Sequence, residues 1–392
     1  MSFSYGYNSF YTVGNEHFKN KTLALLRLNE TSSNDITWTF HDSEFNSIDW
    51  SVEPSLSINE FYAQRALMLR QKYDYIILMC SGGPDSNNVA YSFLKNGIHV
   101  DEIIASAPLS GLNNWVDNEN DKTTENVISE TRLAQIPFVK EIQSNYPNVR
   151  ITINDYFEDI LNYKDSDWLV KSTDYVHPTT VARYDMSKFP HLRKLAETDK
   201  KIGVIYGIDK PFLFIRDGKL YNTISDYAVN VPTEPVFHNF YNELFYFSHE
   251  IPQMISKQCH LLKKWLLLPE NKQALLLTKL NMQTSPFKEF NSGLYQRAIV
   301  PCIYPMIETP IWQAGKPKYN IMADMDSWFY TNHSELKIYD MMTSNIRSII
   351  GNLRSDLFQY KHYRDASGQV IKYMSGFKVF SKTFLIGDIN EK

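Results

Sequence analysis

A continuous apolar run followed by a glycine-rich turn constrains this chain more than any other feature. Residues 75–80 read Y-I-I-L-M-C, and residues 81–86 read S-G-G-P-D-S. An apolar run of this length, stopped by a Gly-Gly-Pro turn, is typical of a strand buried on both faces of a parallel sheet. From Ser86 to Gly97 apolar residues recur at helical spacing, and Gly97 is a suitable stop for that helix. The pattern therefore predicts a strand, a glycine-rich loop and the N-terminus of a helix.

This arrangement favours the binding of an anion. Backbone N–H groups of the loop and the positive end of the helix dipole point to the same place. Gly82 and Gly83 let the backbone approach a ligand because they have no Cβ, and Ser81 and Ser86 add hydroxyl donors. Asp85 would repel a phosphate unless a cation lay between them. The combination predicts a phosphate together with a divalent metal, most simply Mg²⁺, at Asp85.

Residues 81–86 match the S-G-G-x-D-S signature of the PP-loop ATP pyrophosphatase superfamily, and the strand before and helix after the loop resemble the context that this family requires. The resemblance implies that ATP and Mg²⁺ are bound and that ATP is cleaved between its α and β phosphates, with formation of an adenylated intermediate. The alternative interpretation is an ordinary turn between a strand and a helix. A Walker A loop is not present, because Gly218-Lys219 and Gly315-Lys316 lack the partner glycine and the following Ser or Thr.

Predicted strands and helices alternate around this loop. The alternation predicts an α/β fold with a parallel, doubly wound sheet, and the resemblance implies a sheet like that of the adenine nucleotide alpha hydrolases. Ser57 and Glu60 form a capping box for a helix that precedes the loop. The further predicted strands are 102–107, 149–153 and 202–206, and the predicted helices are 58–72, 124–146 (interrupted at Pro137), 157–163 and 190–198.

The chain is long enough for more than one domain, and we expect three parts. Residues 1–70 form an N-terminal extension that ends in a helix, 71–235 form the PP-loop nucleotide-binding domain, and 236–392 form a mainly helical substrate domain. Within these parts the patterns predict short strands at 12–13 and 22–26, a hairpin of 212–215 with 220–223, helices at 254–268, 272–280 and 335–358, and a final hairpin of 370–373 with 377–380.

Two more loops follow predicted strands and should meet the first one, since ligands bind beyond the carboxyl ends of parallel strands. The resemblance implies that Ser106 and Ala107 lie where the family binds adenine and ribose. It also implies a second pyrophosphate loop near Gly207, with Asp209 as a metal ligand and Lys210 as the cation that stabilises the departing pyrophosphate. This second loop is shorter than in the family, and a solvated turn is the alternative. Arg183, Arg216 and Lys219 are the next candidate cations.

The remaining candidates carry weaker signals. His177 is a candidate for the acceptor site, although a lone histidine is more often a packed or surface residue. Asp324 and Asp326 form an Asp-Met-Asp pair that would need a third ligand to hold a metal. Cys80, Cys259 and Cys302 are widely separated, so they form neither a redox pair nor a disulfide framework. We therefore expect no covalent role for the three thiols.

Composition limits the partners. A hydrophobic content of 43% and a charged content of 21% are ordinary for a soluble globular protein. The net charge of −4 does not support a broad nucleic-acid-binding surface, although a local basic groove stays open. The N-terminal residues show no signal-peptide pattern, and apolar runs such as 265–268 are too short to span a membrane. We therefore expect a cytoplasmic protein with a small-molecule acceptor and no membrane contact; the oligomeric state is not predicted.

The resemblance is strongest to the asparagine-synthetase-like branch. That branch carries an N-terminal glutaminase domain with a cysteine after the initiator Met, whereas this chain has Ser2 and too short a segment before the loop. The resemblance therefore implies an AMP-forming, amidoligase-like enzyme that activates a carboxylate or carbonyl oxygen for attack by ammonia or an amine. The alternatives are modification of a nucleobase or tRNA, by lysidine-type or thiolation chemistry, and a catalytically silent nucleotide-binding protein. The acceptor itself is not predicted.

Overall fold

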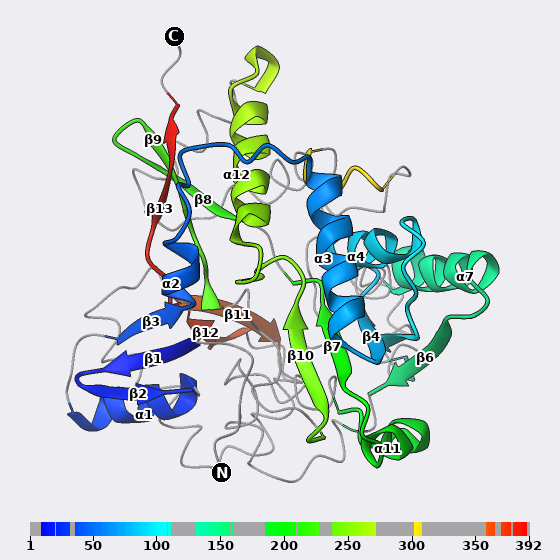
Figure 1. The fold of residues 1–392 in the computed structure, drawn as a ribbon. Coiled ribbons are helices and arrows are strands. Elements are labelled where there is room, and N and C mark those ends of the chain that lie inside the picture. The colour runs from blue at the N-terminus through cyan, green and yellow to red at the C-terminus, as the bar shows by residue number, and fades with distance from the viewer. Residues whose placement is uncertain are drawn as a thin grey trace.

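The structure is a computed structural model, and it combines one parallel sheet with several small antiparallel sheets (Figure 1). It describes residues 9–19, 21–31, 36–107, 109–110, 131–156, 159, 185–208, 211–226, 237–271, 302–307, 358–364, 370–377 and 379–389. The α/β class expected from the alternating pattern is confirmed.

The parallel sheet has five strands in the order β10-β7-β4-β5-β6. The chain runs outward from β4 through β5 to β6, then returns to the other side of β4 as β7 and continues to β10. The strand order therefore reverses between β4 and β7, which is where such sheets bind ligands. The strands are β4 (Tyr75–Cys80), β5 (Glu102–Ala107), β6 (Arg150–Asp155), β7 (Ile202–Tyr206) and β10 (Phe240–Leu244).

Among the helices beside this sheet, α3 has the predicted bounds and the others overlap their predicted ranges. Helix α3 (Ile58–Lys72) starts at the capping box: Glu60 N donates to Ser57 Oγ at 3.3 Å, and Ser57 N donates to Glu60 Oε2 at 2.8 Å. Helix α4 (Pro84–Leu94) stops before Gly97, which has φ +69°. A π-helical turn over Thr131–Gln135 leads into α7 (Ile136–Asn145), in agreement with the interruption expected near Pro137. Helix α11 is Pro190–Ala196.

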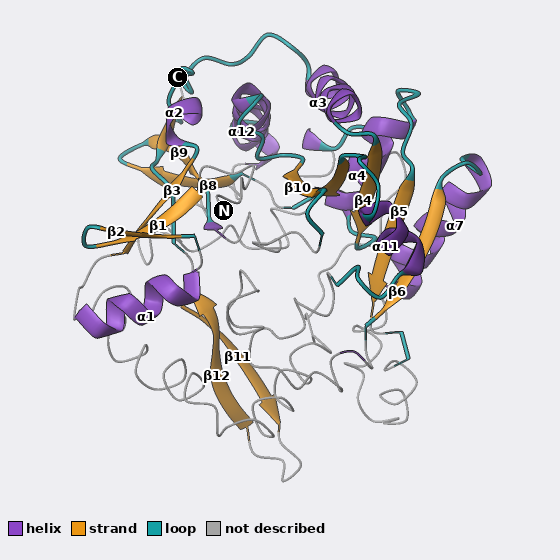
Figure 2. Cartoon of the chain, turned by 60° about the horizontal axis from the view of Figure 1, so that its bottom comes forward, coloured by secondary structure: helices purple, strands orange, loops and turns teal. Residues whose placement is uncertain are grey.

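A second group of elements packs beside the parallel sheet. The β8–β9 hairpin turns through Asp217 and Gly218, both with positive φ, as the Asp-Gly signal predicts. Helix α12 (Pro252–Leu266) lies between the parallel sheet and the sheet formed by β8, β9 and β13 (Figures 1 and 2). The other elements are β1 (Ser9–Val13), β2 (Glu16–Phe18), α1 (Lys21–Thr31), β3 (Ile36–Phe40), α2 (Asp42–Phe45), β8 (Phe212–Arg216), β9 (Lys219–Thr223), a 3-10 turn (Pro269–Asn271), β11 (Phe358–Arg364), β12 (Val370–Phe377) and β13 (Phe384–Asp388).

Two local predictions are wrong. Residues 22–26, predicted as a short strand, lie in helix α1, because a segment rich in Leu and Ala forms a helix more readily than a strand. The predicted final hairpin of 370–373 with 377–380 does not form. Instead β12 includes both 370–373 and Phe377, and it pairs with β11. The predicted helix at 272–280, residues 335–357 of the predicted helix 335–358 and most of 157–163 lie outside the described residues. Phe358, the last residue of the second predicted helix, begins strand β11.

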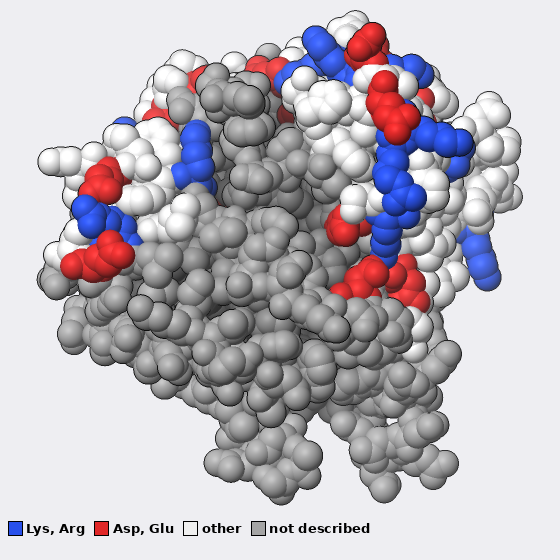
Figure 3. Space-filling view, turned by 90° about the horizontal axis from the view of Figure 1, so that it is seen from below, with Lys and Arg blue, Asp and Glu red and all other residues white. Residues whose placement is uncertain are grey.

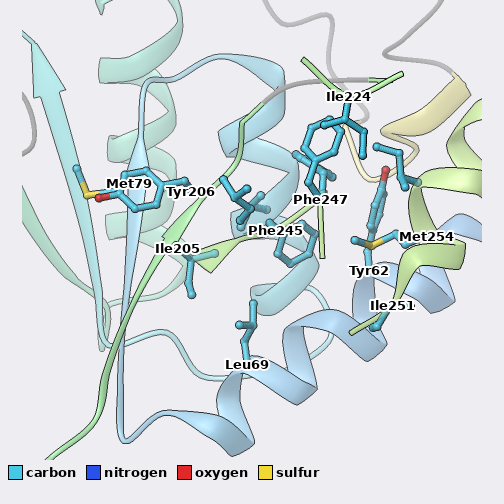
Figure 4. Close-up of a cluster of buried hydrophobic side chains, with 14 of the residues drawn as sticks. Tyr62, Leu69, Met79, Ile205, Tyr206, Ile224, Phe245, Phe247, Ile251 and Met254 are labelled. Carbon is cyan, nitrogen blue, oxygen red and sulfur yellow. The ribbon is translucent and has the colours of Figure 1, made fainter. Parts of the chain in front are cut away.

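Strand pairing links segments on both sides of residue 235, the predicted domain boundary. Strand β10, which the sequence patterns did not indicate, comes from the C-terminal part and joins β7 in the parallel sheet. Conversely, β9 from the nucleotide-binding part pairs with β13 near the end of the chain. The two sheets share one buried apolar core, and Figure 4 shows Tyr62 and Leu69 of α3 packed towards Phe245 and Met254.

Candidate functional site

The loop after β4 is a tight turn whose glycine is required by packing. Gly82 has φ +78°, and a Cβ at this position would lie 2.4 Å from the Cα of Gln135. The π-helical turn therefore fills the space in front of Gly82. The expectation that Gly82 lets a ligand approach the backbone is wrong for this residue. The partly exposed residues of the loop are Ser81, Gly83, Pro84 and Asp85. A ligand would meet these four residues first.

Hydroxyl groups hold the loop in shape. The backbone N–H of Ser81 donates to Ser86 Oγ at 3.3 Å, and that of Gly83 donates to Ser81 Oγ at 3.3 Å. The two serine oxygens lie 3.4 Å apart. These neutral bonds are long, so each contributes little and each hydroxyl can reorient towards a phosphate oxygen at small cost.

The first turn of α4 faces this loop. Gly83 is the N-cap residue and Pro84 follows at the first helical position, where its missing N–H is tolerated. No side chain of the described residues caps this helix. Its first-turn N–H groups and the positive end of its dipole are therefore directed towards the loop. The strand, loop and helix predicted from the sequence are thus present in one piece.

Gln135 and Asn154 connect the loop to the neighbouring strands. The Gln135 side-chain amide donates to the carbonyl of Cys80 at 2.9 Å and to that of Ser106 at 3.2 Å. Asn154 Nδ2 donates to Ser106 Oγ at 3.2 Å. The carboxyl ends of β4, β5 and β6 are therefore joined by neutral amide and hydroxyl groups. Ser106 and Ala107, the expected adenosine-binding positions, lie at this edge and are both buried.

The carboxyl end of β7 reaches the same place. A Cβ on Gly207 would lie 2.8 Å from Val89 Cγ2 and 2.9 Å from the carbonyl oxygen of Asp85, so only glycine lets β7 end against α4. The loops that begin at Ser81 and Gly207 therefore meet at the switch point between β4 and β7. Asp209 and Lys210, predicted as metal ligand and catalytic cation, lie outside the described residues and their roles stay predictions.

Asp85 is contacted by two tyrosines. The hydroxyl of Tyr304 donates to Asp85 Oδ1, and that of Tyr246 donates to the Asp85 carbonyl at 2.8 Å. Asn88, one turn further along α4, donates to the Tyr246 hydroxyl at 3.0 Å. Burial, followed by the negative charge of Asp85, raises the pKa of Tyr304 well above its ordinary value. Tyr304 therefore remains a hydrogen-bond donor at any physiological pH.

These residues fit a nucleotide-bound Mg²⁺ better than a metal held by protein alone. Within the described part of the chain, no group of three or more His, Cys, Asp or Glu side chains could hold a metal ion. Mg²⁺ is commonly bound by one or two carboxylates together with substrate phosphates and water. Asp85, in the first turn of α4 and half-buried, supplies one such carboxylate beside the loop.

Other predicted residues lie elsewhere. Arg216 and Lys219 flank the β8–β9 turn, on the opposite side of the molecule from the β4 loop (Figures 1 and 2), so neither is near the loop. Burial raises the pKa of Cys80 and of Cys302 to about 11, which keeps both thiols protonated and unreactive at neutral pH. Arg183, His177, Asp324 and Asp326 lie outside the described residues.

Four residues of this region were missed by the sequence analysis: Gln135, Asn154, Tyr246 and Tyr304. Asn154 carried a usable signal, because it follows a predicted strand at the carboxyl edge. Gln135 sits in the segment 124–146, predicted as a helix interrupted at Pro137, and the two tyrosines come from distant segments with no pattern of their own. Only the fold brings them to the loop.

Surface charge and helix composition bear on the kinds of partner that the described part of the chain could contact. Among the residues that Figure 3 colours, several Lys and Arg side chains form a narrow stripe, and Asp and Glu side chains lie beside it. Among the helices that the structure describes, none has both the length and the apolar composition of a membrane span. No protein-family model and no characterised protein has a sequence that matches this chain significantly.

Proposed function

We propose that the chain is an ATP-dependent adenylating ligase of the PP-loop type. It would cleave ATP to AMP and pyrophosphate and activate a carboxylate or carbonyl oxygen for attack by ammonia or an amine. One observation carries the proposal: the S-G-G-P-D-S loop lies at the switch point of a parallel sheet, between β4 and an uncapped helix and against Gly207. The two serines also stabilise the turn itself, so the Asp85 carboxylate beside them is the group that an ordinary strand–helix turn does not need.

The residues of the loop have separate tasks in this proposal. The hydroxyls of Ser81 and Ser86 and the first-turn N–H groups of α4 bind oxygens of the β and γ phosphates. Asp85 holds Mg²⁺, which when bound neutralises part of the phosphate charge. Ser106 and Ala107 bind the adenosine at the end of β5. Asp209 is a second metal ligand, and Lys210 stabilises the charge that develops on pyrophosphate as it leaves.

The acceptor is proposed to be a small molecule. The net charge of −4 offers little to a tRNA backbone, which is bound mainly through its phosphates. Thiolation is disfavoured by the raised thiol pKa values of Cys80 and Cys302. A nucleotide-binding protein without catalysis is the remaining alternative, and the experiment below separates it from a ligase.

The test follows the α-phosphate of ATP. The protein is incubated with α-labelled ATP, Mg²⁺, ammonium ions and a pool of small carboxylic acids, and the products are separated by chromatography. We expect labelled AMP that depends on both Mg²⁺ and the acid pool. Asp85→Asn is the matched control, because it keeps the size of the side chain and removes its charge. Labelled ADP as the main product would reject the pyrophosphatase assignment, and tight binding with no product would favour the silent module.

A further inference from the structure

Residues 302–307 form a short segment of the C-terminal half that lies against the nucleotide loop. Three hydrogen bonds hold it there. Tyr62 OH of α3 donates to the Ile303 carbonyl at 2.6 Å, and Lys95 Nζ at the end of α4 donates to the Met306 carbonyl at 2.7 Å. The third bond runs from Tyr304 OH to Asp85 Oδ1. Figure 4 shows Tyr62 rising from α3 towards this segment, which is drawn in yellow.

The segment is part of the core and not a loosely attached loop. Ile303 and Tyr304 are both fully buried, and the ring of Tyr304 packs on Tyr246 with centroids 5.6 Å apart. Gln258 of α12 donates to the Tyr62 hydroxyl at 2.8 Å and so supports the bond to Ile303. Because the segment is fixed on both sides of Tyr304, the tyrosine hydroxyl reaches Asp85 in one defined position.

The contact has a clear chemical consequence. A carboxylate can accept about four hydrogen bonds or metal contacts through its two oxygens, so the bond from Tyr304 at Oδ1 is compatible with a metal on the same group. A carboxylate that binds a metal is itself usually held by a hydrogen bond from a neighbour, and losing that neighbour typically lowers metal affinity about 10- to 100-fold. Tyr246 cannot replace Tyr304 here, since it bonds to the backbone of Asp85.

We propose that Tyr304 is a positioning residue that orients the Asp85 carboxylate for the metal–nucleotide complex, so that the C-terminal half of the chain completes the nucleotide site. This inference rests on the proposed function, since it assumes that ATP binds at the loop. In this proposal the parallel sheet alone does not form the complete nucleotide site, because Tyr304 comes from the C-terminal half.

The experiment compares ATP affinity with and without metal. Equilibrium titration of Tyr304→Phe in Mg²⁺ is expected to show about tenfold weaker ATP binding than the wild type, while the affinity measured in EDTA stays unchanged. Tyr62→Phe is the matched control. It also removes a buried tyrosine hydroxyl that bonds to this segment, but that hydroxyl bonds to Ile303 and Gln258 and not to the Asp85 carboxylate, so the variant should keep the wild-type ratio of the two affinities.

The outcomes are separable. A Tyr304→Phe variant that binds Mg²⁺–ATP as tightly as the wild type, or more tightly, overturns the positioning role but leaves the proposed function intact. Wild-type protein that binds no ATP rejects both. Hydrogen exchange on the wild type gives a test that needs no variant: Mg²⁺–ATP should protect the amides of residues 302–307 more than ATP in EDTA does. Equal protection in the two conditions also overturns the role.

Discussion

Two polar clusters beside the parallel sheet are built from different chemistry. The charged cluster (Arg65, Lys72, Tyr73, Glu243 and Glu250) joins α3 to β10 and the segment after it. The loop cluster (Ser81, Ser86, Ser106, Gln135 and Asn154) joins the carboxyl ends of β4, β5 and β6. In the charged cluster Arg65 donates to Glu243 at 2.9 Å and also to Glu250, and Lys72 lies 2.6 Å from Glu243. In the loop cluster every donor and acceptor is neutral, with distances of 2.9 to 3.4 Å.

The difference indicates what each cluster does. Arg65 is almost fully buried, and although burial opposes it, the charges of Arg65 and Lys72 lower the pKa of Glu243. Two cations and two anions are paired with one another there, although the Nε of Arg65 has no hydrogen-bond partner among the described residues. The neutral bonds of the loop cluster are weaker and can be exchanged for bonds to phosphate. We infer that the charged cluster serves the fold and that the loop cluster serves binding.

Removing one charge from the charged cluster should produce the largest change in stability. Arg65→Met leaves Glu243 buried without its main partner and should lower the free energy of unfolding by about 3–5 kcal/mol, measured by urea denaturation. The double variant Arg65→Met with Glu243→Leu should recover part of this loss, because no unpaired charge is left. An Arg65→Met variant with wild-type stability would contradict the structural role given to this cluster.

The stability of the fold should also depend on pH through the buried histidine His41. His41 stacks on His249 with ring centroids 4.1 Å apart, and burial, followed by the charge of His249, lowers the pKa of His41 to about 4. The unfolded chain, with an ordinary histidine pKa near 6.5, binds the proton first. The contribution of neutral His41 to the free energy of unfolding is therefore fully present above about pH 6.5. It is lost as the pH falls towards 4, by up to about 3 kcal/mol.

His41→Asn tests this pH dependence. Asparagine tolerates the left-handed backbone at this position, where φ is +46°, so the variant removes the titration without adding backbone strain. Urea denaturation at pH 7, 5.5 and 4 should show that the variant loses less stability on acidification than the wild type. Parallel losses in the two proteins would show that His41 does not titrate in this way.

Asp85→Asn should affect binding and leave the fold intact. The substitution keeps an oxygen that can accept the Tyr304 hydrogen bond but removes the charge that Mg²⁺ needs. Affinity for Mg²⁺–ATP should fall about a hundredfold, or about 2.7 kcal/mol, while the unfolding temperature stays close to that of the wild type. Calorimetric titration and thermal unfolding measure the two quantities. Loss of stability with unchanged affinity would reverse the roles assigned to the clusters.

Gln135→Leu should produce the smallest change of the series. It removes the donor shared by the Cys80 and Ser106 carbonyls at nearly constant volume, and should lower the free energy of unfolding by about 1–2 kcal/mol. ATP affinity should fall as well, because the ends of β4 and β5 are no longer tied together. A change in stability alone would place Gln135 in the fold and outside the binding region.

Local sequence patterns predicted much of the parallel sheet. Strands β4, β5 and β7 and helix α3 match their predicted ranges, because a buried apolar run and a capping box are decided by neighbouring residues. Strand β10 was missed because F-Y-N-E-L has no clear alternation, and it forms by pairing with β7, far away in the chain. The same holds for β11 and β12, whose partner strands a local pattern cannot choose.

What the sequence determined by itself is the strand, loop and helix around residues 75–97, together with the residue types that point to a phosphate and a metal. These features depend on short-range chemistry: apolar periodicity, glycine and proline geometry, and hydroxyl and carboxylate groups a few residues apart. Only the tertiary structure decided which distant groups meet that loop. Gln135 fills the space before Gly82, Gly207 admits the end of β7, and Tyr304 reaches Asp85 across 219 positions of the chain. Such contacts follow from packing of the whole core, which no single segment encodes.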